Sequence, residues 1–67
     1  MILDLNPLPF KLALDIIQWC FDNNIDRAKA FVLVEQLNVP AHERSLGIEW
    51  TLDIPDSYVT WMMVRFS

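Results

Sequence analysis

Three polar residues, Asp22, Asn24 and Asp26, have the alternate spacing that opens a calcium-binding loop. In such a loop the sixth position is a glycine that permits a sharp turn, and the twelfth is a glutamate that binds the ion through both oxygens. This chain has Arg27 and Leu33 at those positions. The pattern therefore predicts no metal site, and we interpret these residues as a connection that caps a following helix.

The other residues that could carry out a reaction lack the neighbours that the chemistry requires. Cys20 is expected near the C-terminal end of an apolar helix, where the helix dipole disfavours a thiolate. His42 and Glu43 are not followed by the second histidine of a zinc-binding helix motif. Ser45 and Ser57 lie outside any nucleophile-elbow context. We therefore predict a non-enzymatic protein with no catalytic residue, cofactor, metal or small-molecule substrate.

The composition excludes further classes of protein. Apolar residues make up 54% of the 67 residues, which argues against disorder, and a single glycine cannot build a nucleotide-binding loop. Nine acidic and five basic residues give a net charge of −4, which repels nucleic-acid phosphates, so direct binding to DNA or RNA is not expected. The one cysteine cannot form an intrachain disulfide, and no stretch resembles a signal peptide or a membrane span. We expect a cytoplasmic protein.

The first predicted element is a helix from Pro7 to about Asn23. Asn6 suits the capping position, and proline is favoured at the first helical position. The asparagines at positions 23 and 24 should end the helix, because asparagine tolerates the left-handed conformation. Nearly all other residues in this helix are apolar, so it should be covered on several sides. Its polar residues form one narrow stripe: Lys11, Asp15, Gln18 and Asp22.

The second predicted element runs from Arg27 to about Asn38. Asp26 can cap it, the apolar residues recur with helical spacing, and Pro40 ends it. The same stretch could instead form a short buried strand over residues 28–37.

A change of period to two after Gly47 predicts a strand over residues 48–54. Residues 54–57 suit a type I turn with proline at its second position, and the β-branched and aromatic residues of 58–66 favour a second strand. The resulting hairpin register places Trp50 opposite Trp61 on the face that covers the helices. We therefore expect Trp61 in the core.

These elements predict a single α+β domain over residues 1–67, with two N-terminal helices packed on a C-terminal antiparallel β-hairpin. One alternative makes residues 28–37 a strand, which gives one helix on a three-stranded antiparallel sheet. A third possibility makes residues 56–66 a helix, although that segment lacks a capping box.

Apolar residues on more than one side of each element exceed what so small a domain can bury. We therefore predict a protein–protein interaction module, acting as a homo-oligomer or as an inhibitor or adaptor of a larger protein. Such a small chain is typical of a compact genome such as that of a phage. The expected contact residues lie on the hairpin face that the helices leave open: Tyr58, Thr60, Met62, Val64 and Phe66.

A different class of function is an electrostatic decoy, in which carboxylates imitate nucleic-acid phosphates and inhibit a DNA- or RNA-binding protein. Decoy binding should weaken steeply with salt, whereas an apolar interface should not. A third hypothesis is a structural subunit of a larger assembly. The decoy residues would be Asp15, Asp22, Asp26, Glu49, Asp53 and Asp56.

Overall fold

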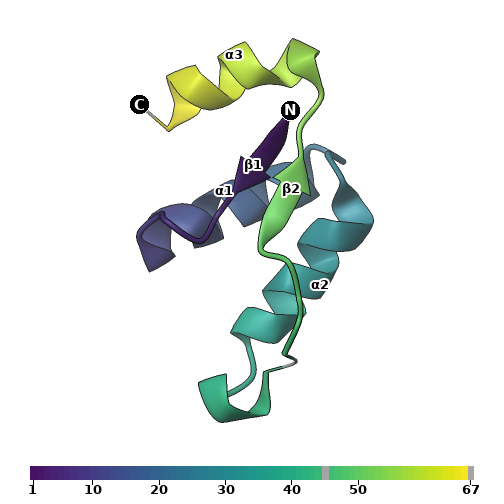
Figure 1. Cartoon of the computed structure of the whole chain (residues 1–67). Helices are drawn as coiled ribbons and strands as arrows, with labels where there is room; N and C mark the ends of the chain where they lie inside the picture. The colour runs from purple at the N-terminus through teal and green to yellow at the C-terminus, as the bar shows by residue number, and fades with distance from the viewer. Residues whose placement is uncertain (45, 67) are drawn as a thin grey trace.

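The computed structural model describes residues 1–44 and 46–66 of the chain. Three helices and a two-stranded sheet form a small α+β arrangement in the described part. Helix α1 lies behind the sheet, α2 extends to one side of it, and α3 crosses the end of the sheet next to the N-terminus (Figure 1). In chain order the elements are β1 (Ile2–Asp4), α1 (Phe10–Asp22), α2 (Arg27–Leu37), the 3-10 helix η1 (Ala41–Glu43), β2 (Thr51–Asp53) and α3 (Asp56–Arg65).

The sheet pairs the N-terminal strand with a strand that lies close in sequence to the last helix. β1 and β2 are antiparallel, with Leu3 opposite Leu52. The pairing continues beyond the strands: Met1 and Ile54 exchange two main-chain hydrogen bonds of 2.7 and 2.8 Å, and the Leu5 amide donates to the carbonyl of Trp50 at 2.8 Å. The predicted alternation in 48–54 is confirmed, because its apolar residues are buried or half-buried while the intervening acids are exposed. The strand itself is shorter than predicted.

The first helix is confirmed in its end and its exposed stripe, but it starts three residues later than predicted and is correspondingly shorter. The four predicted polar positions of α1 are all exposed, and every apolar residue of α1 except Phe10 is buried or half-buried. The helix begins at Phe10 with Pro9 before it, so Asn6 and Pro7 do not start it. Asn6 instead donates its main-chain N–H to the Asp4 carboxylate at 3.0 Å, which shapes the turn after β1.

The second helix is also confirmed. α2 ends at Leu37, one residue before the predicted end, which excludes the strand alternative for 28–37. Asn24 and Asp26 in the connection from α1 have positive φ angles of 57° and 44°, as the tolerance of asparagine and aspartate for this conformation allows. Asp26 precedes α2, but its side chain makes no capping hydrogen bond.

The predicted C-terminal hairpin is wrong. Residues 56–65 form the helix α3, so β2 pairs with the N-terminal strand, and neither the hairpin nor the three-stranded alternative is present. The helical possibility for this segment matches the structure. Pro55 precedes the first turn rather than occupying a β-turn, and Asp56 and Arg65 at the two ends have the charges that complement the helix dipole.

Tertiary packing explains why a segment rich in β-branched and aromatic residues is helical. Val59, Met62 and Phe66 recur at helical spacing and pack against the core. This face buries apolar surface that a strand would divide between two sides, and burial outweighs weak β-propensity. Trp61 is consequently not in the core or opposite Trp50; 69% of its surface is exposed.

The core lies between α1, α2, the sheet and one face of α3. Ile17, Cys20 and Leu33 of the helices are fully buried against Leu52 and Ile54 of the second strand region. Among residues 1–44 and 46–66 the buried side chains are all apolar: Leu5, Ile16, Ile17, Cys20, Ile25, Ala30, Leu33, Leu52, Ile54 and Met62.

Two alanine substitutions distinguish this packing from the predicted hairpin. Ile17→Ala removes a fully buried side chain and should lower the free energy of unfolding by roughly 2 to 5 kcal/mol. Trp61→Ala should lower it by less than about 1 kcal/mol, because the indole is largely exposed. Urea denaturation at low protein concentration measures both. A loss of several kcal/mol for Trp61→Ala would contradict this packing and show that Trp61 lies in the core.

Candidate functional site

Three exposed large apolar side chains of α3 form a ridge on the helix. Tyr58, Trp61 and Val64 are spaced three residues apart, so they lie in one row along the helix. Their exposed fractions are 38%, 69% and 70%. We call these three residues the outer face of α3. Helix α3 lies at one extremity of the molecule, with the other elements on one side of it (Figure 1).

Aromatic contacts to α1 hold α3 so that this face points outward. The Trp19 ring of α1 meets Tyr58 and Phe66 edge to face, with ring centroids 6.3 and 5.8 Å apart. Met62, between them in sequence, is buried. Because these residues turn one side of α3 towards the core, Trp61 cannot be covered by the described part of the chain without rotating the helix.

The structure separates the five predicted contact residues. Tyr58, Thr60 and Val64 are exposed, whereas Met62 is buried and Phe66 is half-buried beside Trp19. Period-two reasoning had placed all five on one open face. Helical period places Tyr58, Met62 and Phe66 on the side of α3 that contacts Trp19, and Thr60 and Val64 on another side.

Trp61 is the residue of this surface that sequence reasoning missed. The assumed hairpin assigned it to the core, but its three-residue spacing from Tyr58 and Val64 could have indicated a helical ridge. Met63 is also 64% exposed. Two residues along a helix correspond to a rotation of about 200°, so Met63 lies on a different side from Trp61.

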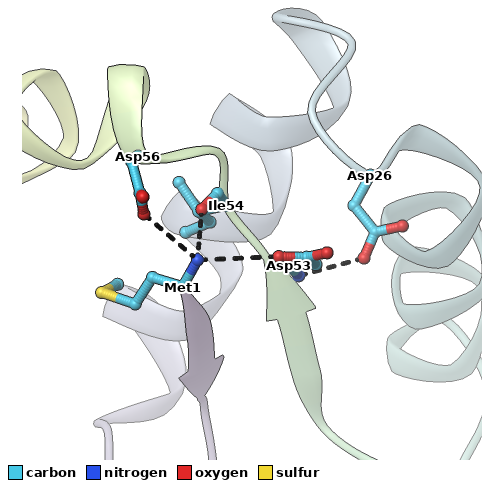
Figure 2. A network of polar contacts seen from close by, with 5 residues as sticks. All are labelled: Met1, Asp26, Asp53, Ile54 and Asp56. Atoms are coloured by element: carbon cyan, nitrogen blue, oxygen red, sulfur yellow. Dashed lines mark hydrogen bonds and ion pairs between the residues drawn. The ribbon is translucent and has the colours of Figure 1, made fainter.

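A second feature is a polar network around the amino group of Met1 (Figure 2). This ammonium donates to the Ile54 carbonyl at 2.8 Å and lies 3.7 Å from a carboxylate oxygen of both Asp53 and Asp56. The Asp26 carboxylate accepts a hydrogen bond of 3.1 Å from the Asp53 main-chain N–H. The network therefore connects β1, β2, the start of α3 and the residue before α2.

The network has a structural role. Both aspartates that pair with the ammonium are largely exposed, so solvent screens these ion pairs and each contributes little to stability. The hydrogen bond from Asp53 to Asp26 is more specific, because it satisfies a main-chain donor on the edge of β2 that faces away from β1.

Asp26 should tolerate asparagine better than alanine. Alanine removes the acceptor for the Asp53 amide and is strained at a φ of 44°, so Asp26→Ala should lower the free energy of unfolding by about 1 to 2 kcal/mol. Asp26→Asn keeps an acceptor oxygen and should change it by less than about 0.5 kcal/mol. Thermal or urea unfolding compares the two variants; equal losses would contradict a combined role of strain and hydrogen bonding.

Cys20 is in an environment that keeps its thiol protonated. The side chain is fully buried. Burial, and to a smaller extent the negative charge of Asp26, raises the pKa of the Cys20 thiol from 9.0 to about 11. Since the thiolate is the nucleophilic form, this cysteine is a poor nucleophile near neutral pH.

The raised pKa of Cys20 predicts a loss of stability at alkaline pH. In the unfolded chain the thiol ionises from about pH 9, whereas the folded chain retains the proton until about pH 11. The free energy of unfolding should therefore fall between these values, by about 1 kcal/mol at pH 10. Urea midpoints at pH 8 and pH 10 test this, with Cys20→Ala as the control that should decline less. Equal declines would exclude the thiol as the cause.

The described residues offer little else that could bind a ligand. A pocket of about 220 Å³ lies where the turn after β1 meets α1 and the end of α2, and Asn6 is its one polar lining residue. This volume is below the range of about 300 to 1,000 Å³ typical of small-molecule sites. Within residues 1–44 and 46–66, no three His, Cys, Asp or Glu side chains are placed to hold a metal ion.

None of the helices in the described part of the chain combines the length and the apolarity needed to cross a bilayer. Ser45, which the sequence pattern did not predict to be catalytic, lies outside the described residues.

Comparison with known proteins returned no match: no family, no curated protein and no solved structure is significantly similar to this chain. Function is therefore inferred from the geometry of the chain itself.

Proposed function

We propose that this protein is a non-enzymatic interaction module that binds another polypeptide through the outer face of α3. One observation carries the proposal: an exposed tryptophan stands at the centre of a ridge, with a tyrosine and a valine one helical turn to either side. Tryptophan and tyrosine are enriched in the cores of protein interfaces and among the residues that dominate their binding energy. A row spaced by three or four residues is also the pattern by which a helix enters an apolar groove.

The surroundings of the outer face support binding by apolar contact. α3 has one acidic and one basic residue, at its opposite ends, so it adds nothing to the net charge of −4. Of the acids that a decoy would use, Asp53 and Asp56 lie beside the positive amino group of Met1, which weakens their resemblance to a row of phosphates. The interaction module is therefore preferred to the decoy.

The chemistry of the chain supports a role as inhibitor or adaptor rather than as enzyme. The buried Cys20 thiol is protonated at neutral pH, which removes the strongest potential nucleophile. A single buried cysteine also suits a reducing compartment, which supports the proposal of a cytoplasmic protein.

Photo-cross-linking tests the proposed surface. Replacing Trp61 by benzoylphenylalanine should give a covalent adduct on irradiation in an extract of the source cells, because the probe lies within the interface. Phe31 is the matched control, because it is an aromatic residue that is 50% exposed but belongs to another helix, α2. The same probe at position 31 should give no adduct, or at most a much weaker one.

The result discriminates between the functions. Adducts from position 61 that persist at high salt support an apolar interface, whereas loss of the adduct at high salt would favour the acidic decoy. Failure to obtain adducts from position 61, or equal yields from positions 61 and 31, would overturn the proposed function.

A further inference from the structure

We propose that the pocket between the turn after β1, α1 and the end of α2 binds a small neutral aromatic ring that carries one hydrogen-bond donor, such as an indole or a phenol. This inference goes beyond the proposed function, because within the described part of the chain no residue of α3 lines the pocket. The evidence is a small residue in the pocket wall, the hydrogen bonds that support the walls, the volume and the one polar side chain.

A small residue in the apolar face of α1 leaves room for the pocket. Phe10, Ala13 and Ile17 lie on one face of α1, since they are spaced by three and four residues, and all three line the pocket. Ala13 is the small member of this row. Leu37 at the end of α2 and Trp50 just before β2 contribute further apolar walls. We therefore expect a larger side chain at position 13 to fill the space.

Hydrogen bonds hold the walls of the pocket in place. The Leu5 amide donates to the Trp50 carbonyl at 2.8 Å, and the Leu8 amide donates to the Leu5 carbonyl at 3.1 Å. All three of these residues line the pocket. Asn6 donates twice to one oxygen of the Asp4 carboxylate, from its main-chain N–H at 3.0 Å and from Nδ2 at 3.1 Å. The pocket is therefore formed before a ligand binds, which lowers the entropic cost of binding.

The size and the lining of the pocket favour a single or fused aromatic ring. Its volume is about 220 Å³. An apolar protein cavity of about 150 Å³ accepts benzene, so this pocket has room for a somewhat larger ring system. Phe10 and Trp50 supply aromatic rings to the lining. Aromatic rings attract one another in offset or edge-to-face arrangements, which favours an aromatic occupant over an aliphatic one.

The Asn6 side chain determines which polar group the ligand should carry. The ionised Asp4 carboxylate only accepts hydrogen bonds, so the amide nitrogen of Asn6 must be the atom that faces it. Within the described part of the chain, Asn6 Oδ1 accepts no hydrogen bond. This oxygen is therefore available to an N–H or O–H group of the ligand. The neighbouring Asp4 and the net charge of −4 disfavour an anionic ligand.

Titration of the isotope-labelled chain with free indole, followed by nuclear magnetic resonance, measures this binding. We expect saturable shifts with a dissociation constant on the order of 0.1 to 1 mM, as suits a ligand of about nine heavy atoms. The side-chain N–H signal of Trp50 should shift because Trp50 lines the pocket, whereas that of Trp61 on α3 should not. Shifts that do not saturate, or equal shifts for the two tryptophans, would show adsorption to exposed apolar surface and overturn the proposal.

Filling the pocket tests the position of the ligand. Ala13→Leu should weaken indole binding at least tenfold, because the added carbons occupy the space. Ala28→Leu is the matched control: it makes the same change at an exposed residue of α2 that does not line the pocket, and it should leave the affinity unchanged. Circular dichroism checks that both variants fold. Indole binding that Ala13→Leu does not weaken would place the ligand elsewhere.

Benzofuran tests the hydrogen bond, because it has the ring size of indole but an oxygen in place of the N–H donor. It should bind about threefold to tenfold more weakly than indole. Asn6→Ala should remove this difference by weakening indole binding alone, and the unchanged benzofuran affinity shows that the pocket is preserved. Benzofuran that binds as tightly as indole, or a difference that persists in Asn6→Ala, would contradict the assigned donor.

Discussion

The pairing of the chain's first residues with residues 50–54 is the constraint on which the other elements depend. Main-chain hydrogen bonds extend from Met1 opposite Ile54 to Leu5 opposite Trp50, beyond the short strands themselves. The inward side chains of this ladder, including Leu5, Leu52 and Ile54, are buried against the helices. Because the second strand ends beside the N-terminus, the chain that leaves it must cross that end of the sheet, and α3 lies there (Figure 1).

The position of α3 then determines which of its residues are available for binding. Trp19 of α1 contacts Tyr58 and Phe66 edge to face. These two contacts fix the rotation of α3 about its own axis. Met62 is turned inward and Trp61, its neighbour in the chain, is turned outward. The interaction surface is therefore a consequence of core packing on the other side of the same helix.

Polar contacts act mainly at the edges of the sheet. A two-stranded sheet has unpaired main-chain groups on both outer edges, and such edges favour unwanted pairing between chains. The Asp26 carboxylate satisfies one of these groups on β2, the main-chain N–H of Asp53. Aspartates at 4 and 53 leave charges along the exposed strands, which also disfavours edge pairing.

Local pattern predicted most of α1 and favoured α2: the polar stripe of Lys11, Asp15, Gln18 and Asp22 indicated a helix and its exposed side, and helical spacing favoured α2 while leaving a strand over residues 28–37 open. It also located the inward residues of the second strand. It could not identify that strand's partner, because a ladder between residues 1–5 and 50–54 is a contact between distant segments that no local period encodes. A hairpin register predicts a strand over residues 58–66, with Trp61 in the core and Met62 at the surface. Tertiary packing decided the reverse, because Val59, Met62 and Phe66 bury a continuous apolar face against α1 only when this segment is helical.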